Sequence, residues 1–296
     1  DAPAHVQDAR SWQYYHYRSH FWDRVDLSDA RMVRDPAFHG LLEQYWNGVL
    51  PQMPDSMLHW GIDLIERAEN EEVFKYLVHY ITYAAESSKI MCMDLIFVEM
   101  VDRYYRKGKA PWMDDKALEK VVQRADDLRY SRCGHKIPNI TLPDATGQNW
   151  VSLYDIEANF TIVSIWESSC GHCKVEMPLL KDLYAEWHDR GVEVFSIGND
   201  FETEPWIEFL EEKELTDWIN VSDNPEINAT DSATILVHSG VTNLQSLNFR
   251  KTFDVFATPK LFLLDRDKVI IAKQIGAEQL GEILQRAFDE GMFEKR

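Results

Sequence analysis

The sequence predicts an α/β part with a central mixed sheet flanked by helices, preceded by an all-α helical part. Two observations support this. Up to about residue 132, apolar residues recur at steps of three and four, whereas beyond residue 134 strand-like and helix-like segments alternate. A chain of 296 residues, 45% of them hydrophobic, is long and apolar enough for two packed units. We therefore predict an all-α domain at 1–133 and a second domain at 134–296.

The helical part contains three apolar stripes, each with the spacing of one helix face. The stripes are Phe38, Leu41, Leu42, Tyr45 and Trp46; Met57, Trp60, Ile62, Leu64 and Ile65; and Val73, Phe74, Leu77, Val78, Ile81 and Tyr83. Asp55 and Ser56 precede the second stripe and Asn70 precedes the third, so these polar residues are candidate N-caps. The pattern predicts a bundle of about five or six helices.

The second part begins with two short strands around a turn that contains Asp144 and Gly147. Further strands are predicted at 160–166, 192–197, 260–264 and 269–273, and helices at 174–190, 204–212 and 278–291. Residues 228–248 form an additional segment, to which the sequence assigns no role.

The charge of the chain excludes several classes of partner. A net charge of −19 would repel nucleic acid and anionic lipid, which bind clusters of Lys and Arg. No stretch approaches the roughly 18 apolar residues of a membrane-spanning helix, so we expect no span in this chain. The sequence opens with Asp1-Ala2-Pro3-Ala4 and lacks an initiator Met, which indicates that a signal peptide or another leader has been removed. A removed signal peptide would fit an exported protein of the periplasm or the cell envelope.

The strongest candidate site is Cys170-Gly171-His172-Cys173, which follows a predicted buried strand and opens a predicted helix. The first N–H groups and the dipole of a helix stabilise a thiolate, so Cys170 is the candidate nucleophile. Cys173, one turn further on, is the candidate resolving thiol. Gly171 and His172 are expected to tune the pair, because an imidazole near the Cys170 thiolate favours the dithiol and makes the disulfide more oxidising.

Other uses of these cysteines are less well supported. A structural zinc site needs four ligands, and Cys92 and Cys133 stand apart from the Cys-x-x-Cys motif. A peroxidatic cysteine would be expected to have Thr three residues earlier, where this chain has Glu167. Cys92 is expected to be a buried, inert thiol on a helix that begins near residue 88. Cys133 could pair with Cys92 or exchange with Cys170, but we favour a structural thiol.

Several motifs of residues 134–296 resemble the thioredoxin fold. They are Trp166, Cys170-Gly171-His172-Cys173, Pro178 and Ala257-Thr258-Pro259. The hairpin ending at residues 150–153 and the sequence at 174–178 resemble thiol–disulfide oxidoreductases of the TlpA/ResA type from bacterial envelopes. The helical part is similar to an uncharacterised domain that precedes such modules in Bacteroidetes envelope proteins.

The resemblance implies a cis peptide bond before Pro259, which would face the dithiol, and a role for Thr258 in pairing with a bound peptide. It also assigns a supporting role to Trp166. Ser164 stands where thioredoxin has a buried Asp that deprotonates the resolving cysteine, so that base is missing. Glu176 matches an acidic residue of the TlpA/ResA pattern and could substitute only partly. No metal and no cofactor are expected.

We therefore expect an extracytoplasmic thiol–disulfide oxidoreductase whose partners are protein or peptide thiols and disulfides and a redox partner protein. The alternative is a binding or scaffolding protein whose helical domain recognises a partner and whose dithiol is regulatory or vestigial. The aromatic clusters at 12–15 and 104–105 are expected to pack in the core or at a domain interface. A helical domain that drives homodimerisation is a further hypothesis.

Overall fold

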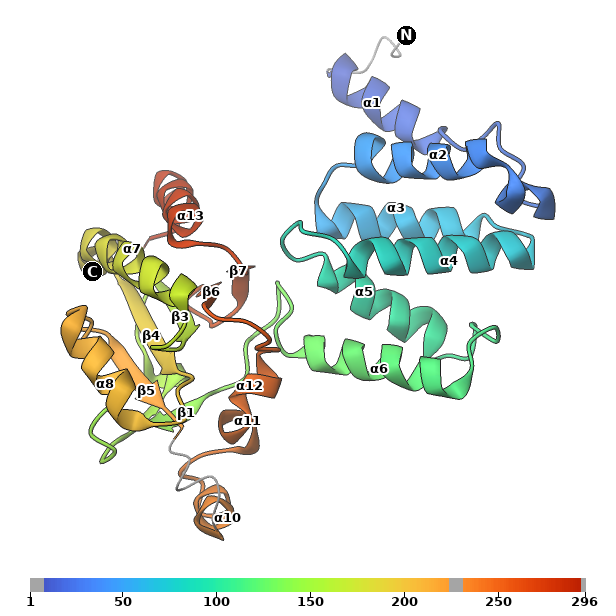
Figure 1. The fold of residues 1–296 in the computed structure, drawn as a ribbon. Helices are drawn as coiled ribbons and strands as arrows, with labels where there is room; N and C mark the ends of the chain where they lie inside the picture. Colours follow the sequence, from blue (N-terminus) through green and yellow to red (C-terminus); the bar gives the residue numbers. More distant parts are fainter. Residues whose placement is uncertain (1–7, 224–230, 294–296) are drawn as a thin grey trace. The chain divides into compact units, whose positions relative to one another are not determined.

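The computed structural model describes residues 8–223 and 231–293 of the chain (Figure 1). The chain divides into two compact units, Asp1–Ala125 and Asp126–Arg296. Within the described ranges, no helix combines the length and apolar character needed to cross a bilayer. The expected signal-peptide cleavage before Asp1 lies outside the described residues.

The first unit is helical, as predicted. Its helical segments are α1 (Ala9–Ser19), η1 (Ala30–Arg34), α2 (Pro36–Gln44), η2 (Tyr45–Val49), α3 (Pro54–Glu66), α4 (Glu71–Glu86), α5 (Asp94–Met100), η3 (Val101–Tyr105) and α6 (Asp115–Arg129), the last of which continues into the second unit. The predicted apolar stripes supply its core, with Leu42, Ile65 and Leu77 fully buried. Tyr83 is an exception, since it is 63% exposed on the outer face of α4.

Short polar side chains set where these helices begin. Asn70 caps α4 as predicted, because its side chain accepts hydrogen bonds from the N–H groups of Glu72 and Val73. The predicted cap at Asp55 and Ser56 is wrong. Helix α3 begins one residue earlier, at Pro54, whose ring suits the first turn, and Asp55 therefore lies inside that turn.

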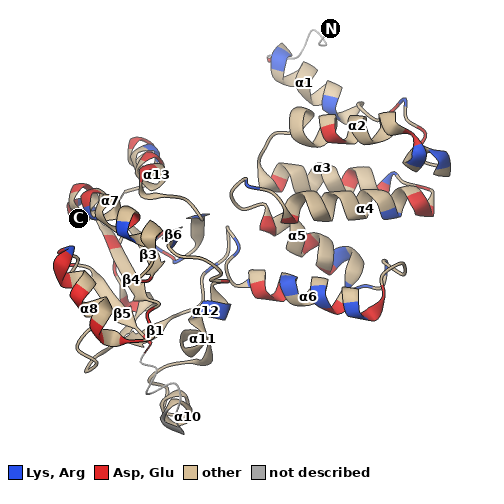
Figure 2. Ribbon diagram, in the orientation of Figure 1, with Lys and Arg blue, Asp and Glu red and all other residues tan. Residues whose placement is uncertain are grey.

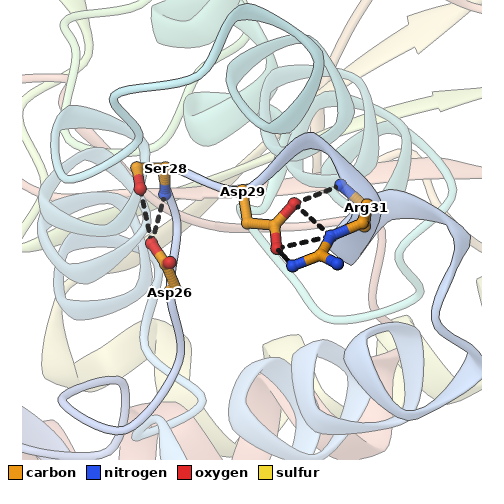
Figure 3. Close-up of polar contacts among 4 residues, drawn as sticks. All are labelled: Asp26, Ser28, Asp29 and Arg31. Atoms are coloured by element: carbon orange, nitrogen blue, oxygen red, sulfur yellow. Dashed lines mark hydrogen bonds and ion pairs between the residues drawn. The ribbon is translucent and has the colours of Figure 1, made fainter.

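The connection between α1 and α2 is held by two aspartates (Figure 3). Asp26 accepts hydrogen bonds from the Ser28 N–H at 3.0 Å and hydroxyl at 2.6 Å. Asp29 accepts from the Arg31 N–H at 2.9 Å and pairs with its guanidinium at 2.6 Å, and so caps η1. Such local bonds let a connection turn without regular structure.

The second unit contains a five-stranded mixed sheet with the strand order β5-β4-β3-β6-β7 and a separate β1-β2 hairpin. The strands are β1 (Thr141–Pro143), β2 (Trp150–Ser152), β3 (Phe160–Trp166), β4 (Val192–Gly198), β5 (Ile219–Ser222), β6 (Lys260–Leu264) and β7 (Ile270–Lys273). The central strand β3 is parallel to β4 and antiparallel to β6, and every residue of β3 is buried. The predicted fold class, a mixed sheet flanked by helices, is confirmed.

Helices α7 (Gly171–Trp187), α8 (Thr203–Glu212) and α13 (Ala277–Asp289) flank this sheet (Figure 1). The short helices η4 (Leu153–Asp155) and η5 (His188–Arg190) follow β2 and α7, respectively. Of the additional segment predicted at 228–248, the residues up to 230 lie outside the described part of the chain. From residue 231 onward the chain forms α10 (Asp231–His238), α11 (Leu244–Leu247) and α12 (Phe249–Thr252). This segment is tied to β1, because Thr141 donates to the Ser246 hydroxyl at 2.8 Å and accepts from the Thr242 hydroxyl at 2.7 Å.

Candidate active site

Strand β3 and helix α7 place the two cysteines of the Cys-x-x-Cys motif. The chain leaves β3 after Trp166, turns through residues 167–169 and enters α7 with Cys170 as its N-cap. The Cys170 sulfur accepts a hydrogen bond from the Cys173 N–H at 3.4 Å, as a capping oxygen does in other helices. Both cysteines are free thiols, Cys170 partly exposed and Cys173 buried.

The loop before β6 brings Thr258 to the Cys170 sulfur, 88 residues away in sequence. The Cys170 thiol donates to the Thr258 carbonyl at 3.2 Å, and the Thr258–Pro259 peptide bond is cis, as the resemblance implies. The antiparallel pairing of β3 with β6 aligns Ile165 with Lys260, so the end of β3 and the start of β6 meet at the dithiol. The sheet register therefore fixes this contact.

The surroundings of the two sulfurs act differently on their pKa values. Burial raises the pKa of Cys170, but hydrogen bonds with the Thr258 side chain, with Cys173 and with the His172 N–H together outweigh it, so the net pKa is lowered. Burial, with a smaller effect of Cys170, raises the pKa of Cys173 to about 12, although the Glu167 N–H lowers it. The exposed sulfur is thus the one that ionises more easily.

Gly171 and His172, which were predicted to tune the dithiol, lie between the two cysteines in the chain. Of these two residues, only His172 acts on Cys170, through its backbone. His172 is exposed on the first turn of α7, and its backbone N–H lowers the Cys170 pKa. Gly171 is also exposed, and a Cβ at this position would have no described heavy atom within 4 Å. The space at Gly171 would therefore accept a larger residue.

Trp166 and Ser164 anchor the strand beneath the site. The buried Trp166 ring donates from its Nε1 to the Ser196 hydroxyl at 2.8 Å and packs against Phe209 at 4.8 Å between ring centroids. Ser164 is fully buried, and its hydroxyl donates to the Met177 sulfur at 3.5 Å. A neutral hydroxyl thus occupies the position where the resemblance expects a carboxylate.

Glu176 contacts helix α13. One of its carboxylate oxygens accepts a hydrogen bond from the Ala277 N–H at 2.5 Å, at the first residue of α13. A Cβ at Gly276 would come within 3.0 Å of the same oxygen, so the two chain segments are closely packed. Glu176 therefore satisfies a free N–H group at the start of α13.

Sequence reasoning missed Asp200 and Ser168. Asp200 follows β4 and is 8% exposed; it accepts hydrogen bonds from the Ser168 N–H on both carboxylate oxygens, each at 3.1 Å, and from the Ser168 hydroxyl. Burial raises its pKa more than the bonds from Ser168 lower it. The signal that could have found them is their position in the sequence, since Ser168 follows β3 and Asp200 follows β4. Because β4 runs parallel to β3, both strands end at the same edge of the sheet.

The favoured predictions of free thiols at Cys92 and Cys133 are wrong, because both residues are disulfide-bonded, as the alternative for Cys133 allowed. Helix α5 begins only at Asp94, and Cys92 lies in the turn before it with a φ of 69°, partly exposed. The expectation of a buried helical thiol rested on a helix that does not extend this far. A cysteine in a turn can adopt backbone angles that a helix forbids.

Comparisons with known proteins agree with this geometry. Residues 133–273 match the AhpC/TSA family. The chain is 32% identical over 99 residues to the thiol-disulfide oxidoreductase ResA of Oceanobacillus iheyensis, an alignment that covers 32% of this chain and only 52% of that relative. The chain thus spans about half the length of that curated relative.

Two solved structures are similar. A domain of a possible thiol-disulfide isomerase from Cytophaga hutchinsonii is 35% identical, with a TM-score of 0.43, over 53% of this chain and 94% of that one. A thioredoxin-like protein from Bacteroides caccae is 19% identical, with a TM-score of 0.65, over 97% of each chain, which is a likeness of fold. Through its C-terminal unit, the chain belongs to the thioredoxin-like thiol–disulfide oxidoreductases of the TlpA/ResA type.

Proposed function

We propose that the chain is an extracytoplasmic enzyme that exchanges disulfides with protein thiols through Cys170 and Cys173, in a redox domain spanning 134–296. One observation carries the proposal. A partly exposed thiol of lowered pKa caps α7, and a buried thiol of raised pKa lies one turn further on. This arrangement separates an attacking sulfur from a resolving sulfur.

In the reducing direction, the Cys170 thiolate attacks one sulfur of a substrate disulfide. A mixed disulfide forms, and the other substrate sulfur leaves as a thiolate that takes up a proton. Cys173 then loses its proton and attacks the Cys170 sulfur. The bond between Cys170 and the substrate breaks, the second substrate sulfur leaves as a thiolate that takes up a proton, and a Cys170–Cys173 disulfide forms. Two electrons pass to the substrate, and a redox partner protein with a thiol pair must reduce the enzyme again. The reverse sequence oxidises a substrate dithiol.

We further propose that Thr258 and Pro259 line the groove that holds the substrate, and that Trp166, Gly171 and His172 support the dithiol. Glu176 supports it only indirectly, by fixing α7 against the start of α13. A polypeptide substrate is favoured by the apolar surface beside the site. Phe256 and Phe201 are the most exposed large hydrophobic side chains among the described residues, at 81% and 77%. Phe256 is two residues from Thr258, and Phe201 follows Asp200, whose carboxylate binds Ser168. Such side chains would contact apolar residues that flank a substrate cysteine.

An insulin-reduction assay with the whole chain tests the proposal. Wild type is expected to reduce insulin with a dithiol donor, Cys170→Ala to be inactive, and Cys173→Ser to accumulate a mixed disulfide that mass spectrometry detects. Glu282→Gln, on α13, is a suitable surface control. Equal turnover by wild type and Cys170→Ala would refute the proposal. Cell fractionation tests the location, since recovery in the cytoplasm would contradict export.

A second function, partner binding by the helical unit, is favoured by one observation. Helix α1 has no buried residue, and Tyr14 and Tyr15 are 44% and 55% exposed, whereas the other predicted aromatic cluster, at 104–105, is buried. Helix α1 also contributes Trp12, His16 and Tyr17 to a groove of about 750 Å³. Under this alternative, a Tyr17→Ser variant would lose a binding partner while both cysteines could be replaced without effect.

A further inference from the structure

A buried ion pair closes the loop that carries Thr258 and Pro259. Lys260 is the first residue of β6 and is 7% exposed, and Asp254 lies two residues after α12 and is 6% exposed. The Lys260 Nζ lies 3.6 Å from a carboxylate oxygen of Asp254 and also donates a hydrogen bond to the Asp254 backbone carbonyl. One side chain therefore joins the two ends of the loop 255–259.

Each end of this loop has a further support. The antiparallel register pairs Lys260 with Ile165 of the central strand β3. At the other end, the Val255 N–H donates to the Arg250 carbonyl of α12 at 2.8 Å. Asp254 has a φ of 53°, a left-handed conformation that Asp adopts more readily than most residues. The Lys260 contacts therefore tie the end of α12 to the central sheet.

Between these ends, the loop carries the groups that face the dithiol. The Thr258 carbonyl accepts a hydrogen bond from the Cys170 thiol at 3.2 Å, and Pro259 follows through the cis peptide bond. A backbone carbonyl beside the nucleophile is an acceptor for a backbone N–H of an extended substrate. A loop that is ordered before the substrate binds loses less conformational entropy on binding.

The ion pair is explained better by the conformation that it specifies than by stability. Burying two charges costs desolvation free energy, and apolar residues of similar volume often stabilise a fold at least as well. Lys260 and Asp254 are both buried, so this cost applies to both of them. What the pair supplies in return is a fixed position for each end of the loop.

We propose that Lys260 is a positioning residue for substrate capture, which holds the Thr258 carbonyl in place at the groove through its contacts with Asp254. This inference rests on the proposed function. In the step that it serves, the Cys170 thiolate attacks one sulfur of the substrate disulfide. The substrate S–S bond breaks, and the other sulfur leaves as a thiolate that takes up a proton. Lys260 acts on this step through the loop and takes no part in the transfer itself.

Two disulfides that differ in size isolate the groove. One is the homodimeric disulfide of a short uncharged peptide with a central cysteine, and the other is hydroxyethyl disulfide, which is too small to pair with the loop backbone. The reduced whole chain is mixed with an excess of each, and mass spectrometry of acid-quenched samples follows the loss of reduced Cys170. Because both reactions use the same thiolate, any effect of a variant on Cys170 ionisation cancels in the ratio of the two rates.

Wild type is expected to react faster with the peptide. In Lys260→Met, the rate with the peptide divided by the rate with hydroxyethyl disulfide should fall about tenfold, because the loop must then be ordered at binding. Asp254→Asn keeps a side-chain carbonyl as acceptor and should lie between wild type and Lys260→Met. The double variant Lys260→Met/Asp254→Asn leaves no carboxylate at this position and should show the same tenfold fall. It decides the matter should Lys260→Met fail to fold.

Lys268→Met is the matched control. Lys268 is also buried, and its Nζ likewise binds a backbone carbonyl and a side-chain oxygen, those of Ile156 at 2.8 Å and Thr161 at 2.9 Å. Thr161 belongs to the first turn of the pleat of β3, at the end of the strand away from Cys170. The ratio of the two rates in Lys268→Met should equal that of wild type.

Three outcomes would overturn the inference while thiol exchange itself remains intact. They are a wild type that does not prefer the peptide, an unchanged ratio in Lys260→Met or in the double variant, and an equal fall in Lys268→Met, which would indicate general loosening. If wild type reacts with neither disulfide, the proposed function fails and this inference fails with it.

Discussion

Cys170 and Cys173 carry the same functional group one helical turn apart, yet their surroundings move their pKa values in opposite directions. The pKa of Cys170 is lowered from that of a free thiol, so its thiolate appears as the pH rises through a value below the usual range. The pKa of Cys173 is raised to about 12, so it stays protonated at neutral pH. We expect iodoacetamide at pH 7 to label Cys170 and spare Cys173, as read by mass spectrometry of the reduced chain.

Thr258→Val is the variant that tests the cause of this difference. It removes the Thr258 hydroxyl at nearly constant volume, so the labelling profile of Cys170 should shift to higher pH because one hydrogen bond to the thiolate is lost. A Cys170 that titrates like free cysteine in wild type, or an unchanged profile in Thr258→Val, would contradict this account.

The His172 backbone gives a prediction about the reduction potential. Its N–H lowers the pKa of Cys170 and so favours the thiolate, hence the dithiol form. Proline lacks this N–H but fits the first turn of a helix, so His172→Pro should make the potential more negative by roughly 20 to 30 mV. The wild-type potential itself should lie above about −270 mV, the value of thioredoxin. Equilibration with glutathione buffers measures both.

His172→Ala is the control, because it keeps the N–H and removes the imidazole. A potential in His172→Ala that stays near wild type would place the effect in the backbone. An equal shift in the Ala and Pro variants would instead assign it to the imidazole, as the sequence alone suggested.

At the scale of elements, the local sequence pattern was enough to predict an element wherever that element is long or wholly apolar. The buried strand β3 and helices α7, α8 and α13 were predicted within a few residues. Strand β5 was not, since it has four residues and two of them, Asn220 and Ser222, are polar. Helices α11 and α12 have four residues each and are held by tertiary bonds such as that of Ser246 with Thr141, which no local pattern encodes.

The same limit applies to the site. Cys170, Cys173 and the cis bond before Pro259 were predictable because a short motif carries each of them. The Asp200–Ser168 anchor joins residues 32 positions apart and depends on the parallel pairing of β3 with β4. Its two members have no distinguishing sequence pattern, so only the folded sheet reveals the contact.

Helix α13 gives a prediction about Glu176. Its carboxylate accepts from Ala277 at the start of α13, and α13 packs against α7, with the Leu183 side chain within 3.2 Å of a Cβ built at Gly281. Replacing a capping acceptor by Ala costs about 1 kcal/mol, so Glu176→Ala should speed hydrogen exchange in the first turn of α13 roughly fivefold. Mass-spectrometric hydrogen exchange measures this.

Glu176→Gln keeps an acceptor oxygen and should retain most of the protection. The labelling profile of Cys170 should be the same in both variants, because Glu176 acts on α13. A shift of that profile in Glu176→Ala without faster exchange in α13 would assign Glu176 to the dithiol instead.

At the scale of the whole molecule, the dominant property is negative charge. The chain has 50 acidic and 31 basic residues, and Figure 2 shows acidic residues on helices of both units. Helix α8, which follows the loop containing Asp200 and Phe201, contains Glu204, Glu208, Glu211 and Glu212 and no basic residue. A charge of this sign slows the approach of acidic partners and speeds that of basic ones.

The last prediction therefore concerns which thiol partners react fastest. Two peptide disulfides of the same length and the same residues next to cysteine, one with three added Lys and one with three added Glu, would be compared in stopped-flow experiments with the reduced chain. At low ionic strength the basic peptide should react at least several-fold faster, because the net negative charge of the enzyme attracts it. In about 0.5 M salt the two rates should converge, since the Debye length falls to a few ångströms. A difference that survives high salt would mean that local contacts at the groove, and not the net charge of −19, distinguish the peptides.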